Sequence, residues 1–298
     1  MDARWTFFSV DVEISNRCDV GCMMCPRSKL ARDRGIMTRE TFAGVARALL
    51  PLKSRVTLSG MGNPLANPLW PEFVEEYKKK GGKIGLVVHG SHLSKEVLDT
   101  LERVQPNFLE ISFPSVDENH FSSLCPNSDY RMAHRAIVSL LSNSFRRFPI
   151  VVVGTRTGLN PDEETAASRH WEQHGLASRV FPCHSRGGSL EDASLVDSPI
   201  KTPVFQKCGL IGLHSFVTWQ GKLLSCCHDM TGETEIGNLT NDEPETLMEK
   251  KSALLEEVNP FSMCIRCDDP YRMIEPPKGP FPESARKRRR VLHNLGKN

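Results

Sequence analysis

The chain has 298 residues, of which 39% are hydrophobic and 25% charged, and its formal net charge is +2. This composition is ordinary for a soluble globular protein with room for one large α/β domain. The small net charge provides no general attraction to nucleic acid or membrane, and no apolar run approaches the roughly 20 residues that span a bilayer. The N-terminus does not have the pattern of a signal peptide. We therefore expect a cytoplasmic protein with neither membrane nor nucleic acid as a partner.

Strand and helix patterns alternate along the first 185 residues. Residues 7–15 alternate apolar and polar side chains, as a strand does, and lead directly to Cys18. Further strands are expected at 54–60, 83–90, 107–115, 149–157 and 178–185, and helices at 37–50, 71–82, 94–104, 129–143 and 160–175. This order predicts an α/β fold with parallel strands and right-handed crossovers. Six units are too few for a closed eight-stranded barrel, so we expect a partial (β/α)6 barrel over residues 1–185, with ligands at the carboxyl ends of its strands.

Three further segments are expected after the barrel: a linker at 186–203, a small C-terminal subdomain at 204–275 and a basic tail at 276–298. The linker is rich in Gly, Ser, Asp and Pro. In the subdomain, residues 214–226 are typical of a hairpin and residues 245–258 of a helix. The tail includes a segment that could form a basic helix. The simpler interpretation is that its charged residues form a solvent-exposed face.

Three of the ten cysteines lie in one short loop after the first strand, in a Cys-x3-Cys-x2-Cys pattern formed by Cys18, Cys22 and Cys25. Clustered cysteines in a reducing compartment indicate metal rather than disulfides. Three thiolates leave one iron of a [4Fe-4S] cluster open to a ligand from outside the protein. A structural zinc site needs a fourth donor, and residues 11–36 contain no other Cys or His. A zinc site completed from afar, or three buried thiols, are the alternatives.

The segment VEISNRCDVGCMMCPRS resembles the radical S-adenosylmethionine (SAM) superfamily, and the resemblance covers about residues 1–185. It implies that the open iron of the [4Fe-4S] cluster binds SAM. It further implies that an electron from the cluster cleaves SAM to a 5′-deoxyadenosyl radical, which abstracts a hydrogen from the substrate. An electron donor such as flavodoxin or ferredoxin is then a required partner.

Other loops resemble the SAM-binding segments of that superfamily. LSGMGNPLANP resembles its glycine-rich motif, which implies SAM-binding roles for Gly60, Gly62 and Asn63. The family often has Glu where this chain has Asn63. VVHGSHL, at 87–93, stands where the family commonly has an Asn-Gly turn, and Ser112 ends the fourth strand, where the family places polar contacts to SAM.

Four later cysteines can close a second site: Cys208, Cys226, Cys264 and Cys267. Four thiolates fill every iron of a [4Fe-4S] cluster, and a four-Cys zinc site is the alternative. The pattern KCGL…TWQGKLLSC…EIGNL…CIRC resembles the auxiliary-cluster domain of radical SAM maturases and of their shortened twitch (SPASM-like) relatives. This implies one auxiliary [4Fe-4S] cluster that does not bind SAM. Cys227 is an alternative ligand to Cys226, which the resemblance favours.

The reaction is indicated by a resemblance to radical SAM enzymes of aminoglycoside biosynthesis, such as 2-deoxy-scyllo-inosamine dehydrogenase and neomycin C epimerase. This implies a small carbohydrate-like substrate. Arg186-Gly187-Gly188 matches the dehydrogenases, in a position to bind SAM or substrate. His228, however, stands where those enzymes have a substrate-facing acid.

Cys227 is a spare thiol that can donate a hydrogen atom to a substrate radical and so invert a carbon centre; Cys125 and Cys183 are the other spare thiols. We expect epimerisation with Cys227, His228 and Arg186 in the catalytic site. Dehydrogenation with the auxiliary cluster as electron acceptor, and radical maturation of a peptide, are the alternatives. The SAM-like loops argue against a purely regulatory iron–sulfur protein.

Overall fold

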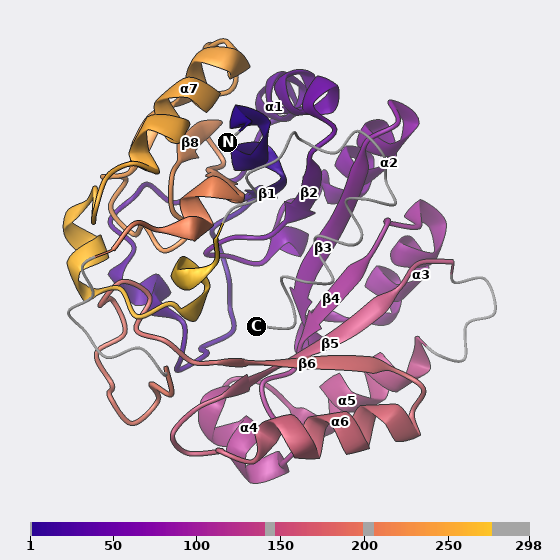
Figure 1. Ribbon diagram of the computed structural model, residues 1–298. Coiled ribbons are helices and arrows are strands. Elements are labelled where there is room, and N and C mark those ends of the chain that lie inside the picture. The colour runs from indigo at the N-terminus through magenta and orange to yellow at the C-terminus, as the bar shows by residue number, and fades with distance from the viewer. Residues whose placement is uncertain (1, 141–146, 199–205, 276–298) are drawn as a thin grey trace.

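The computed structural model describes residues 2–140, 147–198 and 206–275. The predicted basic tail at 276–298 and the last part of the predicted linker lie outside the described residues. Within the described ranges, nine strands form one sheet in the order β6-β5-β4-β3-β2-β1-β7-β8-β9. Figure 1 shows helices along the outer side of this curved sheet.

Six parallel strands from the first part of the chain make up most of the sheet. They are β1 (Ser9–Val12), β2 (Arg55–Leu58), β3 (Lys83–His89), β4 (Leu109–Ser112), β5 (Ile150–Arg156) and β6 (Ala177–Pro182). They lie side by side in chain order, and every pairing among them is parallel. This confirms the predicted parallel α/β fold with six strands. Among the described residues an α-helix follows each of the first five strands, and none lies between β6 and β7. The carboxyl ends of the six strands therefore meet at one edge, where such sheets bind ligands.

The helices begin where the sequence provides capping side chains. They are α1 (Arg39–Leu52), α2 (Trp70–Lys79), α3 (Lys95–Val104), α4 (Glu118–Leu124), α5 (Tyr130–Ser139), α6 (Glu163–Gln173) and α7 (Pro244–Leu254). Thr38, Ser94 and Asp129 each accept a hydrogen bond from a backbone N–H in the first turn of α1, α3 and α5, which satisfies a donor that the helix leaves free. All these helices except α4 were predicted, with ends shifted by a few residues.

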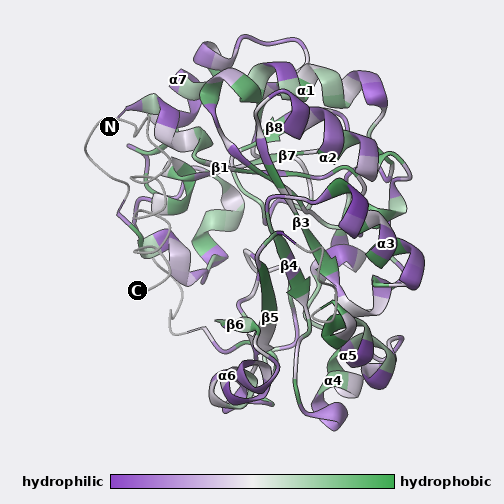
Figure 2. Ribbon diagram, turned by 90° about the vertical axis from the view of Figure 1, so that its right-hand side faces the viewer, coloured by the Kyte–Doolittle hydropathy of each residue, from purple (hydrophilic) through white to green (hydrophobic). Residues whose placement is uncertain are grey.

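The helices pack on an apolar core that the sheet shares. Val10, Val12 and Ile14 are fully buried, and the rings of Phe42 and Phe73 stack with their centroids 4.1 Å apart between α1 and α2. In Figure 2 the strands β3, β4 and β5 are largely hydrophobic, whereas the helices carry polar residues as well. Asp11, the charged residue of β1, alternates with the buried Val10 and Val12, so it lies on the other face of the strand.

The C-terminal part of the chain extends the same sheet. β7 (His214–Val217) pairs in parallel with β1, and β8 (Lys222–Leu224) and β9 (Glu235–Asn238) follow it in antiparallel order. The predicted hairpin with its turn at Gln220-Gly221 is confirmed, and Gly221 has the positive φ of 81° that such a turn requires. Figure 1 shows α7 and β8 close to the N-terminal end of the chain. This arrangement brings the later cysteines to the side of β1.

Lys251 holds α7 to β7 and to the segment before β1. This side chain is fully buried, and its Nζ donates hydrogen bonds to Ser215 Oγ at 2.6 Å, to the Thr6 carbonyl at 3.4 Å and to the His214 carbonyl. Three acceptors match the three donors of an ammonium group. The position of α7 is therefore fixed by polar contacts to β7 as well as by packing.

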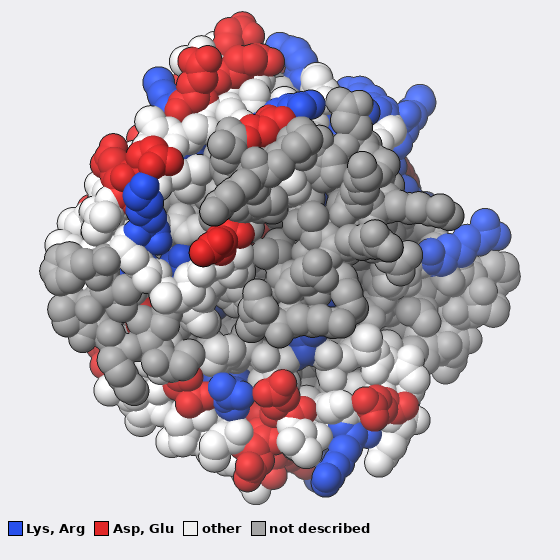
Figure 3. Space-filling model, viewed as in Figure 1, with Lys and Arg blue, Asp and Glu red and all other residues white. Residues whose placement is uncertain are grey.

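Charges of both signs are spread over the described surface. In Figure 3, Lys and Arg side chains are interspersed with Asp and Glu on the face shown, in keeping with the nearly balanced charge of the sequence. Among the described residues, no helix has both the length and the apolar character to cross a membrane.

Candidate active site

A cavity of about 300 Å³ lies at the carboxyl ends of the parallel strands. Nearly all the predicted cluster, SAM-binding and catalytic residues of the barrel line it: Cys18, Cys22, Cys25, Gly60, Gly62, Asn63, Ser112, Arg186 and Cys227. These residues come from the loops after β1, β2 and β6, from the end of β4 and from the segment after β8. The structure therefore brings together at one site side chains that lie up to two hundred residues apart in the sequence.

The three thiols of the first cysteine loop lie close to one another. All three are free thiols. Burial raises the pKa of Cys18 and of Cys25, and the neighbouring Cys22 thiol raises both pKa values further. Partly buried thiols that line one cavity disfavour their ionised forms unless a cation binds them. The three side chains thus fit the [4Fe-4S] cluster predicted from their spacing, because the irons would supply the missing positive charge.

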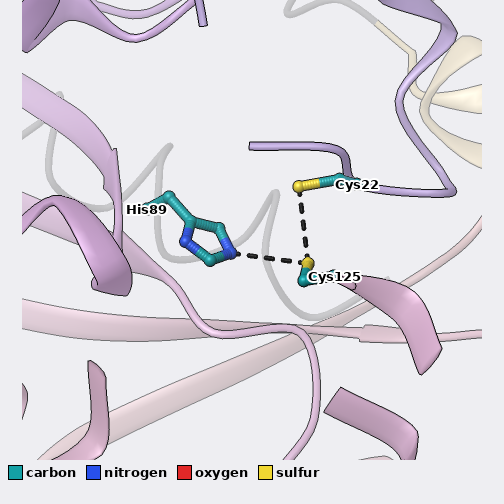
Figure 4. A group of neighbouring side chains, drawn as sticks. All are labelled: Cys22, His89 and Cys125. Atoms are coloured by element: carbon teal, nitrogen blue, oxygen red, sulfur yellow. Dashed lines mark hydrogen bonds between the residues drawn. The ribbon is translucent and has the colours of Figure 1, made fainter. Parts of the chain in front are cut away.

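A fourth cysteine packs against this loop, as Figure 4 shows. The Cys125 thiol, at the end of α4, donates a hydrogen bond to Cys22 Sγ at 3.4 Å, and its sulfur lies 3.5 Å from Nε2 of His89 on β3. Cys125 is fully buried and is not among the residues that line the cavity. Cys125 therefore contacts the Cys22 sulfur from outside the cavity and does not face a substrate.

The glycine-rich loop fits closely against the strand that leads to the cysteines. A Cβ on Gly60 would lie 2.7 Å from the side chain of Glu13, and a Cβ on Gly62 would lie 2.5 Å from the backbone of Asn16. Glu13 is fully buried, forms an ion pair with Arg32 at 2.9 Å and accepts a hydrogen bond from a backbone N–H of the loop. Glycine is therefore required at both positions for the loop to approach the cysteine loop.

Asn63 and Ser112 complete this side of the cavity. The backbone N–H of Asn63 donates to the Arg17 carbonyl at 2.8 Å, and its side-chain oxygen accepts the N–H of Leu65 at 3.0 Å. Ser112 pairs with His89 across β4 and β3. The Asn63 oxygen therefore caps its own turn, and its amide nitrogen is the group left for a ligand.

Arg186 lies in a tight turn after β6. Its φ is 53°, and the two glycines that follow also have positive φ values, a conformation that glycine adopts at little cost. Asp268, next to the predicted ligand Cys267, accepts hydrogen bonds from the backbone and hydroxyl of Ser185 at 2.8 and 2.6 Å. This contact joins the Arg186 turn to the second cysteine group, and Arg186 itself lines the cavity.

The four later cysteines line one separate pocket. They come from the start of a 3-10 turn (Cys208), from the segment after β8 (Cys226) and from a second 3-10 turn (Cys264 and Cys267). Arg272 donates hydrogen bonds to the carbonyls of Cys264 and Cys267 at 2.9 and 2.7 Å. Burial raises the pKa of Cys267 to about 12. Four thiols with disfavoured ionised forms in one pocket, which His228, Asp269 and Arg272 also line, fit a second metal cluster.

Cys226 and Cys227 face different sites. Cys226 lines the pocket of the four cysteines, whereas Cys227 lines the cavity of the first three. A hydrogen bond from the Cys226 thiol, with help from His228 and His214, holds the pKa of Cys227 well below its usual value. A metal on Cys226 would remove the proton that makes this hydrogen bond. The geometry favours Cys226 over Cys227 as the cluster ligand.

His228 does not line the cavity. It is almost fully buried, and its Nε2 lies 2.7 Å from a carboxylate oxygen of Asp269, while its Nδ1 lies 3.7 Å from Cys227 Sγ. The Asp269 and Cys227 side chains outweigh burial and raise the pKa of His228 to about 9. His228 was predicted to face the substrate, but it lies outside the cavity and contacts Cys227, which lines it.

Several cavity residues were not identified from the sequence. They are Asp11, His89, His92, Thr155 and Phe216. The alternation of 7–15 could have indicated Asp11, because a charged residue between buried valines must face a polar space. His214, on β7, lies with its Nε2 3.5 Å from Asp11 Oδ2. No sequence pattern places it there.

Replacing Asp11 with asparagine is expected to change how stability depends on pH. Burial raises the pKa of Asp11 to about 6, against the lowering effect of His214. The folded state therefore binds the proton more tightly than the unfolded state. The contribution of Asp11 to the free energy of unfolding is complete below about pH 4 and is lost as the pH rises through about 6. The side chain is 23% exposed, so we expect a contribution of about 1–3 kcal/mol.

The measurement is the free energy of unfolding in urea from pH 7 down to 4.5. As the pH falls, the wild type should gain stability relative to Asp11→Asn. The exposed Asp99→Asn on α3 is the control and should follow the wild type. Parallel curves for the wild type and Asp11→Asn would contradict the prediction.

Similarity to known proteins agrees with this geometry. Residues 12–167, just over half of the chain, match the model of the radical SAM superfamily. A tungsten-containing aldehyde ferredoxin oxidoreductase cofactor-modifying protein from Pyrococcus furiosus is 28% identical over 92 residues, which are 30% of this chain and 26% of that protein. The match thus spans about a quarter of that relative's length.

Similar folds occur among solved structures. BtrN in complex with AdoMet and 2-DOIA matches with a TM-score of 0.60 and 17% identity over 90% of this chain and 96% of its own. Native anSMEcpe with bound AdoMet matches with a TM-score of 0.62 and 14% identity, over 83% and 82%. Streptococcus suis SuiB bound to its precursor peptide SuiA matches with a TM-score of 0.61 and 9% identity, over 88% and 69%. At these identities the likeness concerns the fold.

The family match covers the cysteine loop, the glycine-rich loop and the strands that carry them. A [4Fe-4S] cluster and SAM are the cofactors that this fold binds, and the three thiols of the cavity are suited to the cluster. The chain belongs to the radical SAM superfamily.

Proposed function

We propose that this radical SAM enzyme inverts a carbon centre of an aminoglycoside-type sugar or cyclitol, with Cys227 as the hydrogen donor. The observation that carries the proposal is the position of Cys227. Of the three spare thiols, it alone lines the cavity that also holds Cys18, Cys22 and Cys25. Cys125 lies behind Cys22, and Cys183 is buried at the end of β6.

Different residues of the chain would bind the two clusters, SAM and the substrate. Cys18, Cys22 and Cys25 would hold the SAM-binding cluster, and Cys208, Cys226, Cys264 and Cys267 would hold an auxiliary [4Fe-4S] cluster. When bound, the first cluster with SAM supplies the 5′-deoxyadenosyl radical that removes a hydrogen atom from the substrate. Gly60, Gly62, Asn63 and Ser112 would contact SAM, and Arg186 would orient SAM or substrate through its planar guanidinium.

In the hydrogen-donation step, His228 or His214 would first return a proton to the sulfur of Cys227, whose pKa the Cys226 thiol and these histidines lower. The S–H bond of Cys227 then breaks and a C–H bond forms on the opposite face of the substrate carbon. The sulfur, now a radical, needs one electron and one proton to return to the thiol. The electron would come from a donor such as flavodoxin or ferredoxin. His214 and His228, each paired with a carboxylate and each acting on Cys227, are the nearby groups that can hold and supply the proton.

Two other reactions are supported by particular observations. Dehydrogenation of an amino-cyclitol is supported by the match to BtrN, which covers nearly all of both chains. It is also supported by the second cysteine pocket, which directly adjoins Cys227 and is suited to an electron acceptor. Radical maturation of a peptide is supported by the fold shared with SuiB, a structure that contains a precursor peptide.

The test incubates the reduced protein with SAM and a panel of pseudo-oligosaccharides in deuterated water. Epimerisation predicts 5′-deoxyadenosine and an isomer of the substrate that carries one deuterium at carbon and is therefore one mass unit heavier, because a thiol hydrogen exchanges with solvent. A product two hydrogens lighter indicates dehydrogenation. The absence of 5′-deoxyadenosine with every substrate would contradict the proposed activity.

Replacing Arg186 with lysine is expected to weaken the binding of SAM or substrate about tenfold, or about 1.4 kcal/mol. Lysine keeps the charge but lacks the planar pair of donors that can hold a carboxylate or two hydroxyls. The readouts are the Kd for SAM and the KM for substrate. Arg179→Lys, an exposed arginine on β6, is the control and should change neither. Unchanged values for Arg186→Lys would assign Arg186 to the linker.

A further inference from the structure

Three histidines meet between two neighbouring helices of the barrel. His134 lies on α5, His170 lies on α6, and His174, four residues after His170, is the residue that caps the C-terminal end of α6. All three are partly buried, and their nearest ring nitrogens lie within 4.8 Å of one another. None of the three lines the cavity or the pocket of the four later cysteines. The cluster is therefore separate from the site described above.

The three rings have the spacing of ligands around a single metal ion. Their centroids form a nearly equilateral triangle with sides of 4.9, 5.4 and 5.2 Å. Three imidazoles on tetrahedral zinc, with Zn–N bonds of about 2.05 Å and a ring radius of about 1.15 Å, would have centroids about 5.2 Å apart. The Nε2 atoms of His134 and His170 are 2.8 Å apart, against about 3.3 Å on such an ion, so a small opening of the pair would admit it.

The surrounding side chains hold this geometry in advance. The His134 ring stacks on Tyr130 and on Trp171, with interplanar angles of 22° and 26°. His170 and His174 are one helical turn apart, so their side chains lie on the same face of α6. A spacing of four residues on a helix is also the arrangement by which paired histidines bind zinc in other proteins.

We propose that His134, His170 and His174 bind one zinc ion that links α5 to α6. Three imidazoles without a carboxylate suit a borderline transition metal rather than magnesium or calcium. A water molecule on the partly exposed side would complete the tetrahedron. Because α5 precedes β5 and α6 follows it, the ion would connect the two helices on either side of that strand in the chain.

The experiment uses the complete protein with its iron–sulfur clusters reconstituted, so that the cysteines are occupied by iron. After incubation with a small excess of Zn²⁺ and desalting, we expect about one retained zinc per chain and a Tm higher by roughly 5 °C at saturating zinc. His174→Ala should reduce the retained zinc about tenfold or more and abolish the Tm shift. His120→Ala, an exposed histidine on α4, is the matched control and should behave as the wild type.

Two further measurements keep the test decisive. His170→Gln is a second variant with the same expected loss, and far-UV circular dichroism with iron content shows that each variant is folded. Zinc-edge X-ray absorption of the wild type should show nitrogen neighbours at about 2.0 Å. Sulfur neighbours at about 2.3 Å, no retained zinc in the wild type, or full retention in both folded variants would overturn the proposal.

Discussion

Changing Cys18, Cys22 and Cys25 together to alanine is expected to remove about half of the bound iron, from near eight to near four irons per chain, and all cleavage of SAM. The three thiols line one wall of the cavity, and burial beside one another makes their ionised forms depend on a bound cation. Without them no cluster can form there, whereas the four later cysteines lie in their own pocket and keep theirs. Iron analysis and detection of 5′-deoxyadenosine measure the two effects.

Cys125→Ala is the matched control for that triple variant. Cys125 contacts Cys22 but does not line the cavity, so this variant should keep both clusters and cleave SAM. Zinc should be measured alongside iron, because Cys125 and His89 are the distant donors that a zinc site on Cys22 would use. SAM cleavage by the triple variant, or zinc in place of iron in the wild type, would refute the assignment of these cysteines.

The parallel barrel was predictable because each strand and helix has its own local pattern. Alternation over 7–15 marks β1, and capping residues such as Thr38 and Ser94 mark helix starts. The pairing of β7 with β1 was not predictable, since it joins residues 9–12 to residues 214–217 and local periodicity contains no information on such distant partners. Helix α4 was missed because it has only seven residues, too few to show a periodic pattern.

The cysteines of the site were predictable because ligand spacing is a local property of the chain. The surroundings of those cysteines were not. Asp11 and His214 lie on strands about two hundred residues apart, and Cys125 reaches Cys22 only through the packing of α4. His228 illustrates the same limit, since its neighbour Cys227 faces the cavity while His228 turns toward Asp269. Which way a side chain points depends on tertiary contacts that no spacing reveals.

Replacing Cys227 with alanine is expected to abolish the inverted product while SAM cleavage and full iron content remain. An S–H bond is weaker than a sugar C–H bond, so transfer of its hydrogen to a carbon radical is favourable, and alanine has no such hydrogen. The neighbouring Cys226 lines the other pocket, so the auxiliary cluster should stay in place. The measurements are iron content, 5′-deoxyadenosine and product analysis in deuterated water.

Cys183→Ala is the matched control, because Cys183 is a spare thiol that does not line the cavity, and it should keep the inverted product. The other possible results for Cys227→Ala each identify a different arrangement. If iron falls by about half, Cys227 is a cluster ligand and Cys226 is the spare thiol. If a dehydrogenated product persists unchanged, the reaction needs no thiol donor, and the auxiliary cluster held by the second cysteine pocket is the electron acceptor. If the inverted product persists with solvent deuterium, the donor lies elsewhere, and Cys183, directly after β6, becomes the next residue to replace.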